Sequence, residues 1–67
     1  MNGVIDKKAE RGFGFIRPED GQNIFFHGSD CVNGYETFDD LNEGDYVTFD
    51  IGEGKDGKPK AVNVDKA

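Results

Sequence analysis

Two short segments of the chain combine aromatic rings with cationic side chains at a spacing of two residues. The first is Arg11-Gly12-Phe13-Gly14-Phe15-Ile16-Arg17, and the second is Ile24-Phe25-Phe26-His27. In a β-strand, successive side chains point to opposite faces, so residues at this spacing share one face. Bases stack on exposed rings and phosphates meet Lys and Arg, so such a face suits single-stranded nucleic acid.

Strand alternation decides which face of the first segment is buried. It places Arg11, Phe13, Phe15 and Arg17 together and leaves Gly12, Gly14 and Ile16 on the other face. Burying two unpaired guanidinium groups costs far more free energy than exposing two rings. We therefore expect Phe13 and Phe15 on the outer face, and ordinary core packing of these rings is the alternative.

The second segment extends the same face. The short connection through residues 18–21 makes the two strands antiparallel neighbours, so Phe25 and His27 join Phe13 and Phe15 in one patch. A slip of one residue would exchange Phe25 with Phe26 and bury the wrong ring. A contiguous aromatic patch at a surface normally marks a binding site.

The remaining pattern predicts the strands that position this patch. Short alternating apolar runs and ten glycines predict an all-β chain, with strands over residues 3–7, 12–17, 23–27, 45–51 and 61–64. Val47, Phe49 and Ile51 alternate with Tyr46, Thr48 and Asp50, which we expect on the solvent side. Residues 28–42 form a long connection with one helical turn at 38–41. Five short strands favour closure into a small barrel, because closure removes exposed edges.

Length and composition exclude most other functions. A chain of 67 residues makes one domain, over residues 1–67, with little room for a cofactor or substrate cleft. With one histidine and one cysteine, Cys31, it lacks the residues for a disulfide or a zinc site. We expect Cys31 to be a buried, unreactive thiol. No nucleophile stands beside a base, so we expect neither an enzyme nor a cofactor.

The chain shows no apolar run of about 18 residues and no signal-peptide layout. We therefore expect a cytoplasmic protein with no membrane partner. We also expect a monomer with no small-molecule substrate.

The net charge, 8 − 14 = −6, taken alone argues against binding of nucleic acid. However, residues 36–50 hold six acids and no base, so the charge is segregated, and a basic face remains possible.

At its aromatic segments the chain resembles the cold-shock domain proteins of bacteria. Residues 11–16 look like the family's first RNP-type motif, usually Lys-Gly-Phe-Gly-Phe-Ile. Residues 24–27 look like the second, usually Val-Phe-Val-His-Phe. Other matches stand in the family's order: Gly3, Asp20-Gly21, Ser29, Glu43-Gly44 and the closing run from Ala61 to Val64.

The resemblance implies a five-stranded antiparallel OB-fold barrel that binds single-stranded RNA or DNA with low sequence specificity. It implies an RNA chaperone or a cold-shock-type regulator of transcription or translation. Tyr35 would take the place of the family's loop aromatic. The predicted nucleic-acid-binding residues are Lys7, Lys8, Arg11, Phe13, Phe15, Arg17, Phe25, His27, Tyr35 and Lys58. Simple solubility charges are the alternative for the three lysines.

The chain departs from the family pattern at two aromatic positions. The usual Lys-Trp-Phe-Asn is replaced by Asp6-Lys7-Lys8-Ala9 in a segment one residue shorter, and the chain has no tryptophan. Gly28 stands where a ring usually follows the histidine. We expect weaker and more salt-dependent binding than in relatives with the tryptophan. The alternative function is a small β-barrel protein-interaction module with a weakened nucleic-acid face, whose binding would not fall steeply with salt.

Overall fold

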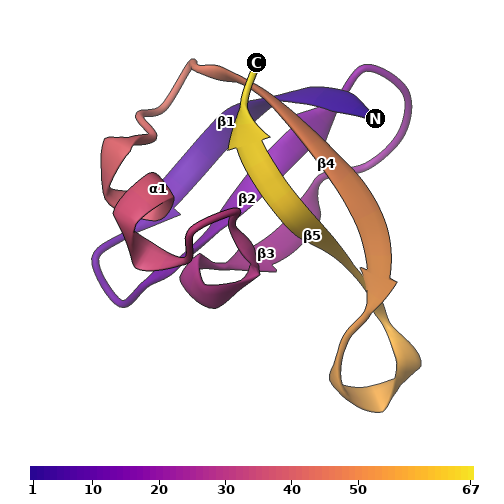
Figure 1. Ribbon diagram of the computed structural model, residues 1–67. Helices are drawn as coiled ribbons and strands as arrows, with labels where there is room; N and C mark the ends of the chain where they lie inside the picture. The colour runs from indigo at the N-terminus through magenta and orange to yellow at the C-terminus, as the bar shows by residue number, and fades with distance from the viewer.

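The computed structural model describes all residues, 1–67, and has five strands in one antiparallel sheet (Figure 1). The strands are β1 Asn2–Ala9, β2 Phe13–Pro18, β3 Ile24–His27, β4 Tyr46–Glu53 and β5 Pro59–Lys66. Their order in the sheet is β3-β2-β1-β4-β5. The predicted all-β fold class is therefore confirmed, and all five predicted strands are present, with β1, β4 and β5 longer than the sequence indicated.

The inner face of the curled sheet holds the core. Alternate residues of the strands are buried there: Ile5, Ile16, Ile24, Phe26, Val47, Phe49, Ala61 and Val64. Gly14 pairs with Phe26 across β2 and β3, and a Cβ on Gly14 would lie 2.9 Å from Phe26 Cε1 and 2.5 Å from the Lys7 carbonyl oxygen. Gly14 is therefore required because the Phe26 ring fills the space over it.

The two edges of the sheet meet without forming a complete ladder. The sheet curls until β5 lies beside β3, but the link is a single parallel bridge between Cys31 and Val64. Val32 N–H donates to the Val64 carbonyl oxygen at 2.8 Å. The predicted closure is therefore incomplete, because β3 has only four residues and the chain turns away at His27.

The long connection between β3 and β4 contains more helix than expected. It begins with a 3-10 turn, η1 Gly28–Asp30, and continues into α1 Tyr35–Asp40, three residues earlier than the predicted turn. Phe38 of α1 is buried, with its ring centroid 5.8 Å from that of Phe26, so the helix covers one end of the core. None of the helices is long and apolar enough to cross a membrane.

The burial of individual residues tests the finer predictions. Cys31 is buried as expected, and burial, reinforced by Asp30 and Asp65, raises the pKa of its thiol to about 11. Tyr46, Thr48 and Asp50 are exposed as predicted. Ile51 is 48% exposed, which corrects the expectation that it shares the inner side with Val47 and Phe49. The β4–β5 register shifts between Thr48 and Asp50, which interrupts the strict alternation after Phe49, and Ile51 lines an open groove instead.

Candidate nucleic-acid interface

Three phenylalanine rings form one contiguous group on the outer face of β2 and β3. Phe13 pairs with His27 and Phe15 with Phe25 in the antiparallel register, so all four side chains share a face. The ring centroids of Phe13, Phe15 and Phe25 lie 5.8–6.3 Å apart. We call these three rings the ring cluster; Phe25 is the most open of them, at 39% exposed.

The predicted facing is observed for the rings of both segments, whereas Arg11 lies in the turn before β2. Phe26 is fully buried while Phe25 points outward, so the possible slip by one residue does not occur. Ile16 and Ile24, which pair directly across the two strands, are also buried and fix the register from the inner side. The rings point outward because the inner face is filled by these apolar side chains. Phe13 and Phe15 remain partly exposed to solvent, and Phe25 is exposed.

His27 and Tyr35 lie at one end of the ring cluster. His27 is the N-cap of η1: Ser29 N–H donates to its Nδ1 at 3.3 Å, while Asp30 accepts from the His27 backbone N–H at 3.2 Å. The Tyr35 hydroxyl lies 3.3 Å from the same Nδ1, and the two rings meet edge to face at 5.8 Å. Since Nδ1 accepts from Ser29, the proton of the neutral imidazole is on Nε2.

The Tyr35 ring occupies the space that a side chain at position 28 would need. A Cβ added to Gly28 would lie 2.5 Å from Tyr35 Cε1, and one added to Gly12 would lie 3.1 Å from the same atom. The Tyr35 ring therefore lies over the backbone of two glycines from different loops. Position 28 thus carries no ring of its own, but the Tyr35 ring of α1 lies over it. Tyr35 remains 48% exposed.

The opposite end of the ring cluster is polar. Arg17 follows Phe15 on the outer face of β2, and its guanidinium lies 3.9 Å from the Asp6 carboxylate. Asn23, which directly precedes β3, donates from Nδ2 to Asp6 Oδ2 at 2.8 Å. Asp6 reaches this face because the β1–β2 register shifts between Ile5 and Lys7, leaving Asp6 as an extra residue. We call Asp6, Arg17 and Asn23 the polar triad.

The other cations of the first segments differ in their placement. Lys7 pairs with Phe15 across β1 and β2, so its side chain stands on the face of the ring cluster. Arg11 is exposed in the turn before β2, where strand alternation no longer fixes its direction.

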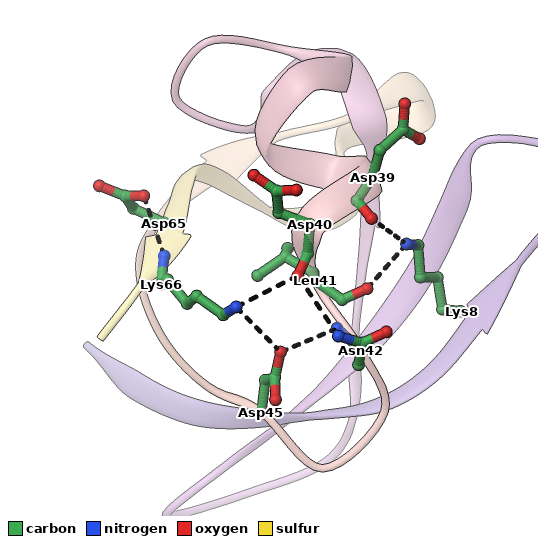
Figure 2. A network of polar contacts seen from close by, with 8 residues as sticks. All are labelled: Lys8, Asp39, Asp40, Leu41, Asn42, Asp45, Asp65 and Lys66. Carbon is green, nitrogen blue, oxygen red and sulfur yellow. Dashed lines mark hydrogen bonds and ion pairs between the residues drawn. The ribbon is translucent and has the colours of Figure 1, made fainter.

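Lys8 lies apart from the ring cluster, on the face of its partner Gly14. Figure 2 shows its ammonium at the end of α1, 2.7 Å from the Leu41 carbonyl oxygen and 3.4 Å from that of Asp39. The same ammonium is 4.7 Å from the centroid of the Phe38 ring. From the other side, Lys66 reaches the Asp40 carbonyl oxygen at 3.3 Å. Both lysines thus satisfy carbonyl groups that the helix terminus leaves unpaired.

The β4–β5 hairpin brings further lysines to the edge of the ring cluster. A groove of about 480 Å³ is lined by Phe25 and His27 on one side and by Lys55, Lys58 and Lys60 on the other. Lys60 is paired with Asp30 at 3.1 Å, whereas Lys55 and Lys58 are exposed. Lys58 therefore lies beside the face on which the sequence predicted it to act.

Four residues of this surface were missing from the predicted site. They are Asp6, Asn23, Ser29 and Lys55. Their polar side chains in turns and at a bulge give no pattern from which a binding role could be inferred. The exception is Ser29, since a serine two residues after a histidine that ends a strand indicates a capped turn.

Taken together, the face offers half-exposed rings on β2 and β3, cations at both margins and no deep cavity. No group of three or more metal-binding side chains occurs in the structure. A fold of five antiparallel strands in one curled sheet, with a ring-bearing face on its second and third strands, is that of an OB-type domain.

Comparison with known proteins shows the family. The family model described as "'Cold-shock' DNA-binding domain" matches residues 1–67. The chain therefore belongs to the cold-shock domain family, a family of nucleic-acid-binding domains, as the resemblance in its aromatic segments implied.

Individual relatives support the same assignment. A "Major cold shock protein" of Streptococcus pyogenes serotype M18 is 51% identical over 59 residues, which cover 87% of this chain and 82% of that protein. The "Cold shock-like protein CspC" of Bacillus cereus is 49% identical over 59 residues, 87% of this chain and 85% of that protein. "Cold shock protein 1" of Arabidopsis thaliana is 49% identical over 57 residues, 84% of this chain but only 18% of that protein.

Proposed function

We propose that the chain binds single-stranded RNA or DNA on the outer face of β1, β2 and β3. The observation that carries this proposal is the ring cluster, in which Phe13, Phe15 and Phe25 stay solvent-accessible and contiguous. Every base has a π-face, so stacking on these rings is tolerant of sequence and contributes about 1–3 kcal/mol per base.

The surrounding charges favour a polyanion at this face in spite of the net charge of −6. Lys7 stands beside Phe15, and Lys55 and Lys58 lie across the groove from Phe25. The acids of α1 and its following loop, such as Asp39, Asp40 and Glu43, belong to the end of the molecule that Lys8 and Lys66 occupy. Local potential at the face, and not the net charge, governs the approach of phosphates.

Binding of unpaired strands has a direct consequence for base-paired RNA. A protein that binds the open strand and not the duplex shifts the equilibrium towards the open strand by mass action, without a nucleotide hydrolysis step. We propose that the chain acts in this way as an RNA chaperone or as a regulator of transcription or translation that alters RNA structure.

A titration tests the proposed function. The protein is added to a fluorescently labelled oligothymidylate of about eight nucleotides, a length typical for one OB fold, and to a duplex of the same length. We expect binding to the single strand alone, with log K falling linearly as log salt rises. The matched variants are Phe13→Ala, within the ring cluster, and Tyr46→Ala, a 72% exposed ring on β4.

The outcomes separate clearly. Loss of binding in Phe13→Ala with an unchanged thermal unfolding midpoint supports the ring cluster as the site. Equal binding of Phe13→Ala and the parent protein, or tighter binding of duplex than of single strand, would contradict it. For the chaperone role, the protein should lower the melting temperature of an RNA hairpin, and Phe13→Ala should not.

A further inference from the structure

The polar triad places a carboxylate on the face where the proposed ligand is an anion. Asp6 is a β-bulge residue of β1 that meets Arg17 at 3.9 Å and accepts a hydrogen bond from Asn23 at 2.8 Å. The three side chains come from β1, from β2 and from the residue directly before β3, the strands that make up the proposed interface. A carboxylate here repels phosphate, so its presence is not explained by binding to the backbone of a nucleic acid.

The triad lies directly next to two rings of the ring cluster. The pair Ile16–Ile24 is buried on the inner face, so Arg17 of β2 and Asn23, directly before β3, are the next outward positions after the pair Phe15–Phe25. An open groove of about 540 Å³ touches Phe15, Phe25 and Asn23, so of the triad only Asn23 lines it. The triad is therefore the next polar group along the strands from the two rings on which a base would stack.

The Asp6 carboxylate keeps acceptor capacity for such an edge. Asn23 donates to Oδ2, while the Arg17 guanidinium lies 3.9 Å from Oδ1, too far for a good hydrogen bond. The Asp6 side chain is 38% exposed. An ionised carboxylate is an acceptor only and has about four lone-pair positions on its two oxygens. Its natural partner is a base edge with adjacent N–H donors.

An exposed ion pair to Arg17 does not by itself account for the triad. At 3.9 Å and with the Arg17 side chain 63% exposed, the pair contributes little to stability. The Asn23 hydrogen bond instead fixes the direction of the carboxylate, which is what recognition of a base edge requires.

We propose that Asp6, held by Asn23, reads the edge of a base stacked on Phe15 or Phe25 and favours guanine over uracil or thymine. Guanine presents N1–H and N2–H₂ side by side, and a carboxylate accepts from both. Uracil and thymine present one N–H between two carbonyl oxygens that the carboxylate repels. In single strands these edges are free for recognition. The proposal rests on the proposed function and adds a base preference to it.

The test uses oligothymidylates of about eight nucleotides whose central residue is thymidine, guanosine or inosine. Inosine lacks only the 2-amino group of guanosine, so it isolates one of the two donors. For the parent protein we expect guanosine to bind about tenfold tighter than thymidine, with inosine in between. This comparison requires no substitution and so does not depend on the folding of a variant.

The matched variants are Asp6→Asn and Asp50→Asn. Asp50 is the counterpart of Asp6 outside the proposed interface, because it accepts a hydrogen bond from Asn63 Nδ2 at 3.1 Å on the outer side of β4 and β5. Each variant removes one negative charge. Asp6→Asn should abolish the preference for guanosine and retain binding to the plain oligothymidylate, whereas Asp50→Asn should retain the preference.

Three results would overturn the proposal. Equal binding of guanosine and thymidine by the parent protein shows that no base edge is read. A preference that survives Asp6→Asn places the reader elsewhere. A uniform increase in affinity for all three oligonucleotides in Asp6→Asn shows that Asp6 only repels phosphate. Each of these results leaves binding to single strands intact, whereas absence of any binding overturns the proposed function itself.

Discussion

The sheet has a first half, β1 to β3, and a second half, β4 and β5. Both halves bury apolar residues on the inner face, but their outer faces differ. In β2 and β3 the inward residues are Ile16, Ile24 and Phe26, and in β4 they are Val47 and Phe49. Outward, the first half carries the ring cluster, whereas β4 carries Tyr46, Thr48 and Asp50. Single exposed apolar residues are ordinary, but contiguous exposed rings are not. We therefore attribute the outer face of β2 and β3 to the proposed binding of nucleic acid, and that of β4 to solubility.

The comparison extends to the polar side chains. Each half has an aspartate that accepts a hydrogen bond from an asparagine amide, Asp6 from Asn23 and Asp50 from Asn63. Only Asp6 stands beside the rings, because the bulge in β1 brings it there. The same chemical pair thus has different neighbours, and its neighbours decide whether it can contribute to binding.

The largest effect is expected from removing a ring in the first half. Phe15→Ala should weaken single-strand binding by about 1–3 kcal/mol, because Phe15 packs against both other rings and each stacked base contributes that much. Tyr46→Ala, which removes a ring from the second half, should leave the affinity unchanged. Fluorescence anisotropy measures both, and an equal loss in the two variants would remove the distinction between the halves.

A second substitution tests the packing of the Tyr35 ring of α1 over Gly28. Gly28→Ala should destabilise the protein by about 1–3 kcal/mol, because the new methyl group overlaps the Tyr35 ring. The double variant Gly28→Ala/Tyr35→Ala should be more stable than the sum of the two single changes predicts. Urea unfolding of all four proteins gives the coupling energy, and strict additivity would mean that the ring does not occupy that space.

Two adjacent lysines sharpen the comparison at the level of charge. Lys7→Ala should reduce the slope of log K against log salt by about 0.7, because one phosphate contact is lost on the face of the rings. Lys8→Ala should leave this slope unchanged and lower stability by about 1 kcal/mol, because its ammonium is bonded to the carbonyl groups of α1. Equal slopes in both variants would place Lys7 outside the interface.

The smallest effect concerns Cys31, which bridges the two edges of the sheet. Its pKa is raised to about 11 by burial, so at pH 10 the thiol is ionised in the unfolded chain but protonated in the folded one. The unfolded state then binds fewer protons, and stability must fall as pH rises above about 9. The urea midpoint should drop between pH 8 and pH 10, and by less in Cys31→Ala. An identical drop in both proteins would assign the effect to other groups.

The sequence alone determined the strands, their pairing and the direction of their side chains, because these features depend on residues close together in the chain. Alternation of side chains in a strand, together with the cost of burying Arg17 or exposing Ile16, decides which way Phe13 and Phe15 face. The pairing of the two ring-bearing strands follows from the short turn between them. The strand count, the all-β class and the burial of Cys31 were predictable on the same grounds, since each depends on a few neighbouring residues.

Only the tertiary structure decided the features that depend on distant residues. Lys8 binds carbonyl groups more than 30 positions away, and Tyr35 fills the space over Gly28 because α1 starts earlier than the pattern indicated. A bulge, which no periodicity announces, turns Asp6 towards Asn23. Backbone alternation fixes the faces of a sheet, but packing between separate elements decides which charge meets which ring.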